Sequence, residues 1–169
     1  MKAINEIEHF DYKDCVIEEA VIGKDIELKL TSLIVKASNS QNTNYTESYA
    51  GDTKAVFENV EILSFTKLGY KKYDANDVLI VEIPDEEQYN SETGINTYDS
   101  MDKFNQCLKK LLAGAYLTEI KLIEDGKYNV WIEIPDDDIS AITDEYEILL
   151  RCGDITMSWD KYLNKVQSY

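Results

Sequence analysis

The sequence predicts a mainly β fold of the α+β class, built as an antiparallel curved sheet that forms a sandwich or an open barrel. Apolar and polar residues alternate over several stretches, short Gly-containing segments separate neighbouring stretches, and one central segment has clear helical spacing. The chain has 169 residues, of which 44% are hydrophobic, so it can bury a core without disulfides or a metal. We therefore expect a single domain over residues 1–169.

Three β-hairpins are expected where runs of alternating residues flank a tight connection. The paired runs are 15–22 with 26–36, 116–123 with 127–134, and 146–152 with 155–158. The apolar phase flips between Leu30 and Leu33, and again near Val56–Phe57. These flips predict β-bulges, which would curve the sheet. Residues 38–53 and 85–99 are rich in Asn, Ser and Thr and are expected to form surface loops.

Helical spacing predicts one amphipathic helix at about 100–113 and a short C-terminal helix. The first has apolar residues at positions 104, 107, 108, 111 and 112, Asp99 or Ser100 to cap its start, and Gly114 to end it. The second is expected from the same spacing in Trp159, Tyr162, Leu163 and Val166.

The acidic residues are concentrated in two windows of the sequence. The chain carries 33 acids and 17 bases, a formal net charge of −16, which disfavours binding to nucleic-acid phosphates. Residues 82–99 and 133–150 hold six and seven carboxylates respectively, with no Lys or Arg. Each window begins where a strand is expected to end at a proline, Pro84 or Pro135, so the two could lie at one end of the sheet. The combined negative field would steer a basic partner toward the protein.

A partner-binding site is predicted from these windows and from two tyrosines beside them, whose rings combine an apolar body with a polar tip. Its predicted residues are Asp85, Glu86, Glu87, Tyr89, Tyr98, Asp136, Asp137 and Asp138. The expected partner is a basic protein. A solvated acidic surface that only keeps the protein soluble is the alternative explanation of the same charge.

The sequence offers no recognisable catalytic machinery, so we expect a non-enzymatic protein without a cofactor. His9 is the only histidine, and no phosphate-binding loop or zinc-type Cys/His spacing occurs. The acidic runs lack the spacing of a calcium loop, so no metal site is expected. Glu82 and Glu133 could form a glycosidase-like carboxylate pair, although outward-facing strand positions explain them better.

The sequence is expected to belong to a cytoplasmic protein that does not enter a membrane. No secretory signal or long apolar run is present. The three cysteines, Cys15, Cys107 and Cys152, are far apart and odd in number, which favours buried thiols over disulfides.

Three segments of the chain resemble small acidic bacterial proteins, some of them of the immunity-protein type that neutralises secreted toxins. The segments read DCVIEEAVIGKDIELKL, NTNYTESYAGDT and WDKYLNKVQ. The resemblance implies a cytosolic binding protein, in agreement with the charge pattern, and it specifies no functional residues.

Two further functions remain open at this stage. A carbohydrate- or small-ligand-binding β-sandwich would need a groove lined by tyrosines or Trp131. A structural or oligomeric protein would use an edge containing Met157, Trp159 and Tyr162. The oligomeric state itself cannot be predicted from the sequence.

Overall fold

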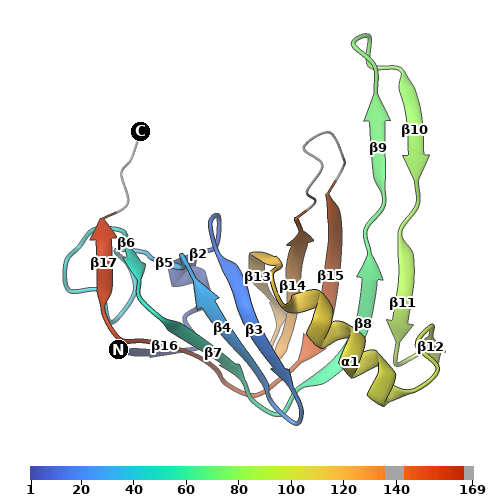
Figure 1. The fold of residues 1–169 in the computed structure, drawn as a ribbon. Coiled ribbons are helices and arrows are strands. Elements are labelled where there is room, and N and C mark those ends of the chain that lie inside the picture. Colours follow the sequence, from blue (N-terminus) through green and yellow to red (C-terminus); the bar gives the residue numbers. More distant parts are fainter. Residues whose placement is uncertain (136–142, 166–169) are drawn as a thin grey trace.

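The computed structural model describes residues 1–135 and 143–165, and its regular structure is mainly β (Figure 1). The helical elements are the short 3-10 helix η1 (Ile7–His9) and the α-helix α1 (Met101–Leu112). The strands are β1 (Lys2–Ile4), β2 (Phe10–Asp11), β3 (Val16–Ile22), β4 (Ile26–Thr31), β5 (Ile34–Val35), β6 (Ser48–Ala50), β7 (Thr53–Phe57), β8 (Glu61–Lys67), β9 (Tyr70–Tyr73), β10 (Leu79–Ile83), β11 (Glu86–Asn90), β12 (Ile95–Asn96), β13 (Tyr116–Glu124), β14 (Lys127–Ile134), β15 (Asp144–Arg151), β16 (Ile155–Trp159) and β17 (Tyr162–Lys165).

Most of these strands form one large antiparallel sheet, as the sequence predicted. Its order is β1-β16-β7-β4-β3-β13-β14-β15-β8-β11-β12, and within the described residues the two edge strands do not pair to close it. A smaller sheet has the order β17-β6-β5-β2, and β9 pairs with β10 alone. The predicted hairpins β3–β4 and β13–β14 are confirmed.

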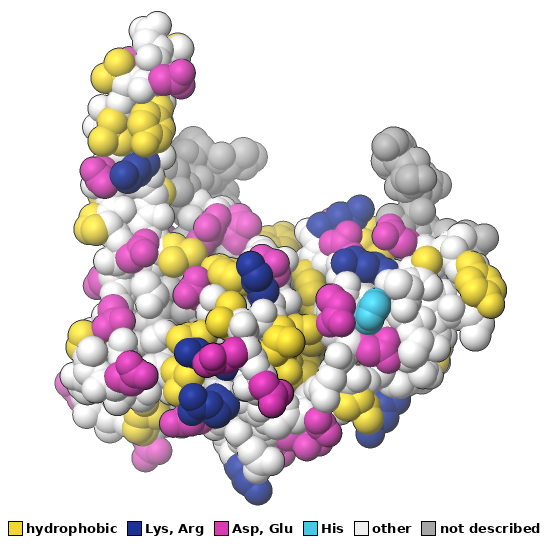
Figure 2. Space-filling model, turned by 180° about the vertical axis from the view of Figure 1, so that it is seen from behind, with side chains coloured by type: hydrophobic (Ala, Val, Ile, Leu, Met, Phe, Trp, Pro, Cys, Tyr) yellow, Lys and Arg dark blue, Asp and Glu magenta, His cyan; other side chains and the backbone are white. Residues whose placement is uncertain are grey.

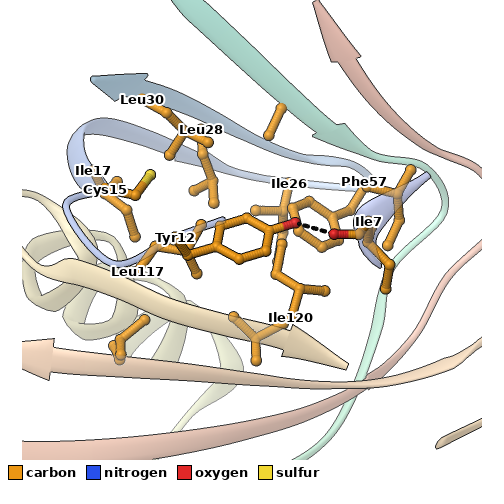
Figure 3. Packing of buried hydrophobic residues seen from close by; sticks show 14 of the residues in the cluster. Ile7, Tyr12, Cys15, Ile17, Ile26, Leu28, Leu30, Phe57, Leu117 and Ile120 are labelled. Atoms are coloured by element: carbon orange, nitrogen blue, oxygen red, sulfur yellow. Dashed lines mark hydrogen bonds between the residues drawn. The ribbon is translucent and has the colours of Figure 1, made fainter. Parts of the chain in front are cut away.

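The large sheet bends at its centre, where β3 and β13 pair only through Val16 and Tyr116. Side chains from both halves fill the space between them, including Ile17 from β3 and Ile120 from β13 (Figure 3). Tyr12 lies within this core, and its hydroxyl donates a hydrogen bond of 3.0 Å to the Ile7 carbonyl. The resulting shape is sandwich-like: the folded large sheet surrounds much of the core, and Phe10, Val35 and Ala50 of the smaller sheet also pack into it.

Helix α1 forms where the spacing of its apolar residues predicted it, and it crosses the inner side of the sheet (Figure 1). The Ser100 hydroxyl caps the helix by accepting a hydrogen bond of 3.2 Å from the Lys103 amide. Phe104 is fully buried, with its ring centroid 4.7 Å from that of Tyr89 on β11 and 5.8 Å from that of Phe65 on β8. These contacts fix the helix against the β8–β11 half of the sheet.

Both predicted bulge positions are wrong, because each phase flip marks a change of strand. The chain leaves β4 at Thr31, passes through Ser32 with φ 59°, and continues into the smaller sheet. Strand β7 keeps an uninterrupted register to its end at Phe57. Irregular registers occur instead within β3–β4, β13–β14, β15–β8, β11–β8 and β9–β10.

The C-terminal helix is not observed. Strand β16 includes Trp159 and pairs with β7 and β1, and Tyr162 begins strand β17. Trp159 and Tyr162, whose spacing suggested a helix, instead pack against each other across the turn between β16 and β17. Their ring centroids are 6.1 Å apart. Val166 lies outside the described residues.

The expected third hairpin and the two expected loops also differ from the structure. Strand β15 pairs with β14 and β8, whereas β16 pairs on the other half of the sheet, so the two do not form a hairpin. Residues 38–53 contain β6, and residues 85–99 contain β11 and β12. These strands form through pairing with distant segments rather than through their own composition.

Strands β9 and β10 form a hairpin, here called the arm (residues 70–83), that projects from the body of the molecule (Figure 1). It continues from β8 and returns into β11 through a tight joint. A side chain at Gly69 would overlap the backbone of Ile83 and Pro84, and the Gly69 amide donates a hydrogen bond of 2.7 Å to Asp85 Oδ1. The joint therefore holds the arm in a defined direction.

Candidate functional site

A row of laterally paired residues crosses the outer side of the sheet, opposite α1. Directly paired residues in an antiparallel sheet have side chains on the same face. The row is formed by Glu119 (β13), Trp131 (β14), Glu147 (β15), Thr66 (β8) and Glu87 (β11). Glu147 and Glu87, one from each acidic window, are thus both paired with Thr66.

The next row on this side adds two more carboxylates. Glu133 on β14 pairs directly with Glu145 on β15, and Tyr116 on β13 completes the row. Like charges placed directly opposite each other destabilise an antiparallel sheet. The sequence keeps this unfavourable pair, so the two rows concentrate negative charge at one place on the sheet.

We call this surface the acidic face and define it by Glu87, Glu119, Glu133, Glu145 and Glu147. Among the described side chains, none of these five carboxylates forms an ion pair. Figure 2 views the molecule from behind and shows acidic side chains interspersed with apolar ones and a few basic ones. The charge of the acidic face is therefore available to a molecule in solution.

Trp131 lies half-buried among these carboxylates, beside a shallow hollow of about 290 Å³. The hollow is lined by Thr118, Glu119, Trp131, Ile132 and Glu145. An aromatic ring beside carboxylates suits a guanidinium or ammonium group, since the ring face attracts the cation and the carboxylates accept its hydrogen bonds. From the sequence, Trp131 was considered only for carbohydrate binding. Glu119 was missed, because its pairing with Trp131 depends on the register between β13 and β14.

The three acids predicted at residues 85–87 do not act as one group. Asp85 is engaged at the joint of the arm, and Glu86 is paired in register with Lys67. Glu87 lies on the acidic face, where its carboxylate accepts a hydrogen bond of 2.9 Å from the Asn90 side chain. Only Glu87 of this run contributes to the acidic face.

The two predicted tyrosines lie on the inner side of the sheet, away from the acidic face. Tyr89 stacks on Phe104, and Tyr98 packs against the same ring at 5.5 Å between centroids. The Tyr98 hydroxyl donates a hydrogen bond of 3.2 Å to the Gln88 side chain. Both rings are half-buried around α1, so the structure places them in a packing role.

The other predicted acids are also separated. Asp136, Asp137 and Asp138 lie outside the described residues, directly after Pro135 at the end of β14. Glu82 pairs with Lys71 in the arm at 3.2 Å, whereas Glu133 belongs to the acidic face, so the two sit on strands that do not pair.

Asp144, another acid of the second window, is neutralised by Lys67. The two side chains are 3.2 Å apart, and this hydrogen bond raises the pKa of Lys67 above its ordinary value. Lys67 pairs in register with Glu86 and Tyr146, on the side of the sheet opposite Thr66. Asp144 and Glu86 therefore belong to a partly neutralised cluster rather than to the acidic face.

The prediction that all three cysteines are buried is wrong for Cys107, which is exposed on α1. Cys15 and Cys152 are buried, and burial raises the pKa of their thiols to about 12 and about 11. His9 forms a hydrogen bond of 2.8 Å with Ser38. Within the described residues, no three His, Cys, Asp or Glu side chains are grouped so that they could hold a metal ion.

Comparisons with protein-family models, with curated proteins and with solved structures find no match to this chain. Among the helices in the described ranges, none is long and apolar enough to cross a membrane.

Proposed function

We propose that this protein is a non-enzymatic binding module that captures a basic protein through the acidic face. The observation that carries the proposal is the register of five adjacent strands, which gathers carboxylates of both acidic windows around Thr66 and Trp131. A toxin of the kind that immunity-type proteins neutralise is a partner of this chemistry.

Two physical effects support this role. The concentrated negative potential would accelerate association with a positive partner by about 10- to 1000-fold at low salt. The Glu133–Glu145 repulsion would be relieved when a cationic side chain lies between the two carboxylates. An arginine bound beside Trp131 would contact the indole ring and the neighbouring carboxylates at the same time.

The proposal can be tested with a synthetic nona-arginine peptide as a defined cationic probe, measured by calorimetry. Glu145→Gln combined with Glu147→Gln removes two charges from the acidic face. We expect the dissociation constant to rise about 2- to 30-fold, because each exposed ion pair contributes about 0.2–1 kcal/mol.

The matched control is Glu47→Gln combined with Glu58→Gln, which removes the same charge from exposed positions away from the acidic face. We expect less than a twofold change for this variant. Equal weakening by both double variants would show that the peptide responds only to net charge, and the proposed site would then be wrong.

The hollow at Trp131 also favours a second candidate function, carbohydrate binding, because a sugar ring can stack on the accessible part of the half-buried indole. The two candidates differ in their response to salt. Binding of the cationic peptide should weaken steeply as ionic strength rises, whereas binding of a neutral oligosaccharide should not.

A further inference from the structure

The arm carries six exposed large apolar side chains. These residues are Tyr70, Tyr73, Val78, Leu79, Ile80 and Ile83. In register, Tyr70 pairs with Ile83 and Tyr73 with Leu79, and the two pairs lie on opposite faces of the ribbon. An isolated two-stranded hairpin is only marginally stable in water. Apolar side chains on both of its faces therefore favour a structure in which the arm is covered.

The outer strand of the arm, β10, also has an open edge. Within the described residues β10 pairs only with β9. The run Val78-Leu79-Ile80-Val81 enters this strand without a charged residue. Proteins usually protect such an edge with lysine, proline or a cover, because its free backbone groups pair readily with another strand. Apart from one register shift between Leu79 and Val81, this stretch has no such protection.

We propose that the arm is a self-association element, and that two copies of the chain pair through their β10 edges. Antiparallel pairing of identical strands produces a two-fold dimer in which the same surface is used by both copies. The two ribbons then form a four-stranded sheet, and the apolar side chains of each arm gain neighbours from the other. The edge pairing satisfies the free backbone groups of both β10 strands.

The charge distribution supports a second copy of the chain as the binding partner of the arm. Residues 70–83 hold two lysines and three carboxylates, so the arm is nearly neutral in a chain of net charge −16. Repulsion between two copies is therefore weakest at the arm. The arm projects away from the body (Figure 1). Pairing there would therefore keep the two acidic bodies apart and leave both acidic faces open.

The edge containing Met157 and Trp159, which sequence reasoning considered for self-association, does not compete with the arm. Both side chains are buried in the core, with 1% and 3% of their surface exposed. The arm is thus the better candidate for an interface between copies.

Sedimentation equilibrium of the full chain tests the proposal, with Ile80→Lys as the disrupting variant and Val21→Lys as its control. Both positions are exposed β-branched residues in strands, at 57% and 56%, but Val21 lies on β3, away from the arm. We expect the wild-type chain and Val21→Lys to sediment at twice the 19.4 kDa chain mass. Ile80→Lys should raise the dimer dissociation constant at least tenfold, because a charge would enter the apolar interface.

A monomeric wild-type protein at concentrations up to about 100 μM would overturn the proposal, as would equal effects of the two lysine variants. Circular dichroism checks that each variant is folded. If Ile80→Lys fails to fold, Ile80→Thr retains the β-branched shape and still reduces the apolar contact, and it should weaken the dimer in the same direction.

Discussion

At the scale of single residues, buried titratable groups make the stability of the fold depend on pH. Tyr12, Cys15 and Cys152 all lie in the core, and desolvation by burial is the main cause of the raised pKa of each group. A buried thiol or phenol is held in its neutral form because the low-dielectric interior disfavours the anion. The same packing that stabilises the fold at neutral pH therefore makes it sensitive to alkaline conditions.

This coupling predicts that stability falls as the pH rises above about 9. In the unfolded chain the thiols ionise near their ordinary pKa of 9.0, whereas folded Cys15 and Cys152 stay protonated up to about 12 and about 11. The unfolded state thus loses protons first, and the free energy of unfolding decreases with increasing pH over this range. Urea denaturation at pH 7.5 and at pH 10 measures the effect.

Two variants make the measurement specific to the buried thiols. Cys15→Ala should flatten the pH dependence between these two values, and Cys107→Ala, at the exposed position, should leave it unchanged. An unaltered slope in Cys15→Ala would contradict the assignment of the effect to this thiol.

At the scale of elements, the sequence predicted correctly those hairpins and the helix that depend on residues close together in the chain. The β3–β4 and β13–β14 hairpins and α1 each depend on residues close together in the chain, such as Ser100 at the helix start. The C-terminal helix and the third hairpin failed because β16 is positioned by distant partners, β7 and β1. A spacing of three between Trp159 and Tyr162 fits a helix equally well, and only long-range pairing decides between the two structures.

Helix α1 depends on one aromatic residue for its attachment to the sheet. Phe104 is fully buried and contacts the rings of Phe65, Tyr89 and Tyr98. We expect Phe104→Ala to lower the free energy of unfolding by about 3–5 kcal/mol, because it removes this packing and leaves a cavity. Chemical denaturation measures the change. Gln106→Ala, at an exposed position of the same helix, should change it by less than about 0.5 kcal/mol, and equal losses would contradict this role of Phe104.

At the scale of the whole molecule, the negative charge is concentrated in two regions. The registers between the strands decide which carboxylates of these regions remain available for binding. The sequence identified the two acidic windows, and it could not reveal that Lys67 neutralises Asp144 or that Glu87 and Glu147 both pair with Thr66. These arrangements depend on β8 lying between β15 and β11, and β15 is far from the other two strands in the chain. The predicted tyrosines failed to join the acidic face for the same reason, since the β11 register directs Tyr89 toward Phe104.

The two proposals together describe a molecule with separate binding surfaces. The acidic face would engage a basic partner, and the arm would join two copies while leaving that face exposed. A dimer of this kind presents two equivalent acidic faces, so a partner with two basic sites would be held more tightly than by the monomer.

An NMR titration of the ¹⁵N-labelled protein with the nona-arginine peptide tests the acidic face most directly, because it locates the bound cation residue by residue. The account predicts that the largest shifts occur at the Trp131 indole and at the backbone amides of Thr66, Glu87, Glu145 and Glu147. Shifts spread evenly over the whole surface of the protein, or centred on the exposed carboxylates of β3, would contradict the account.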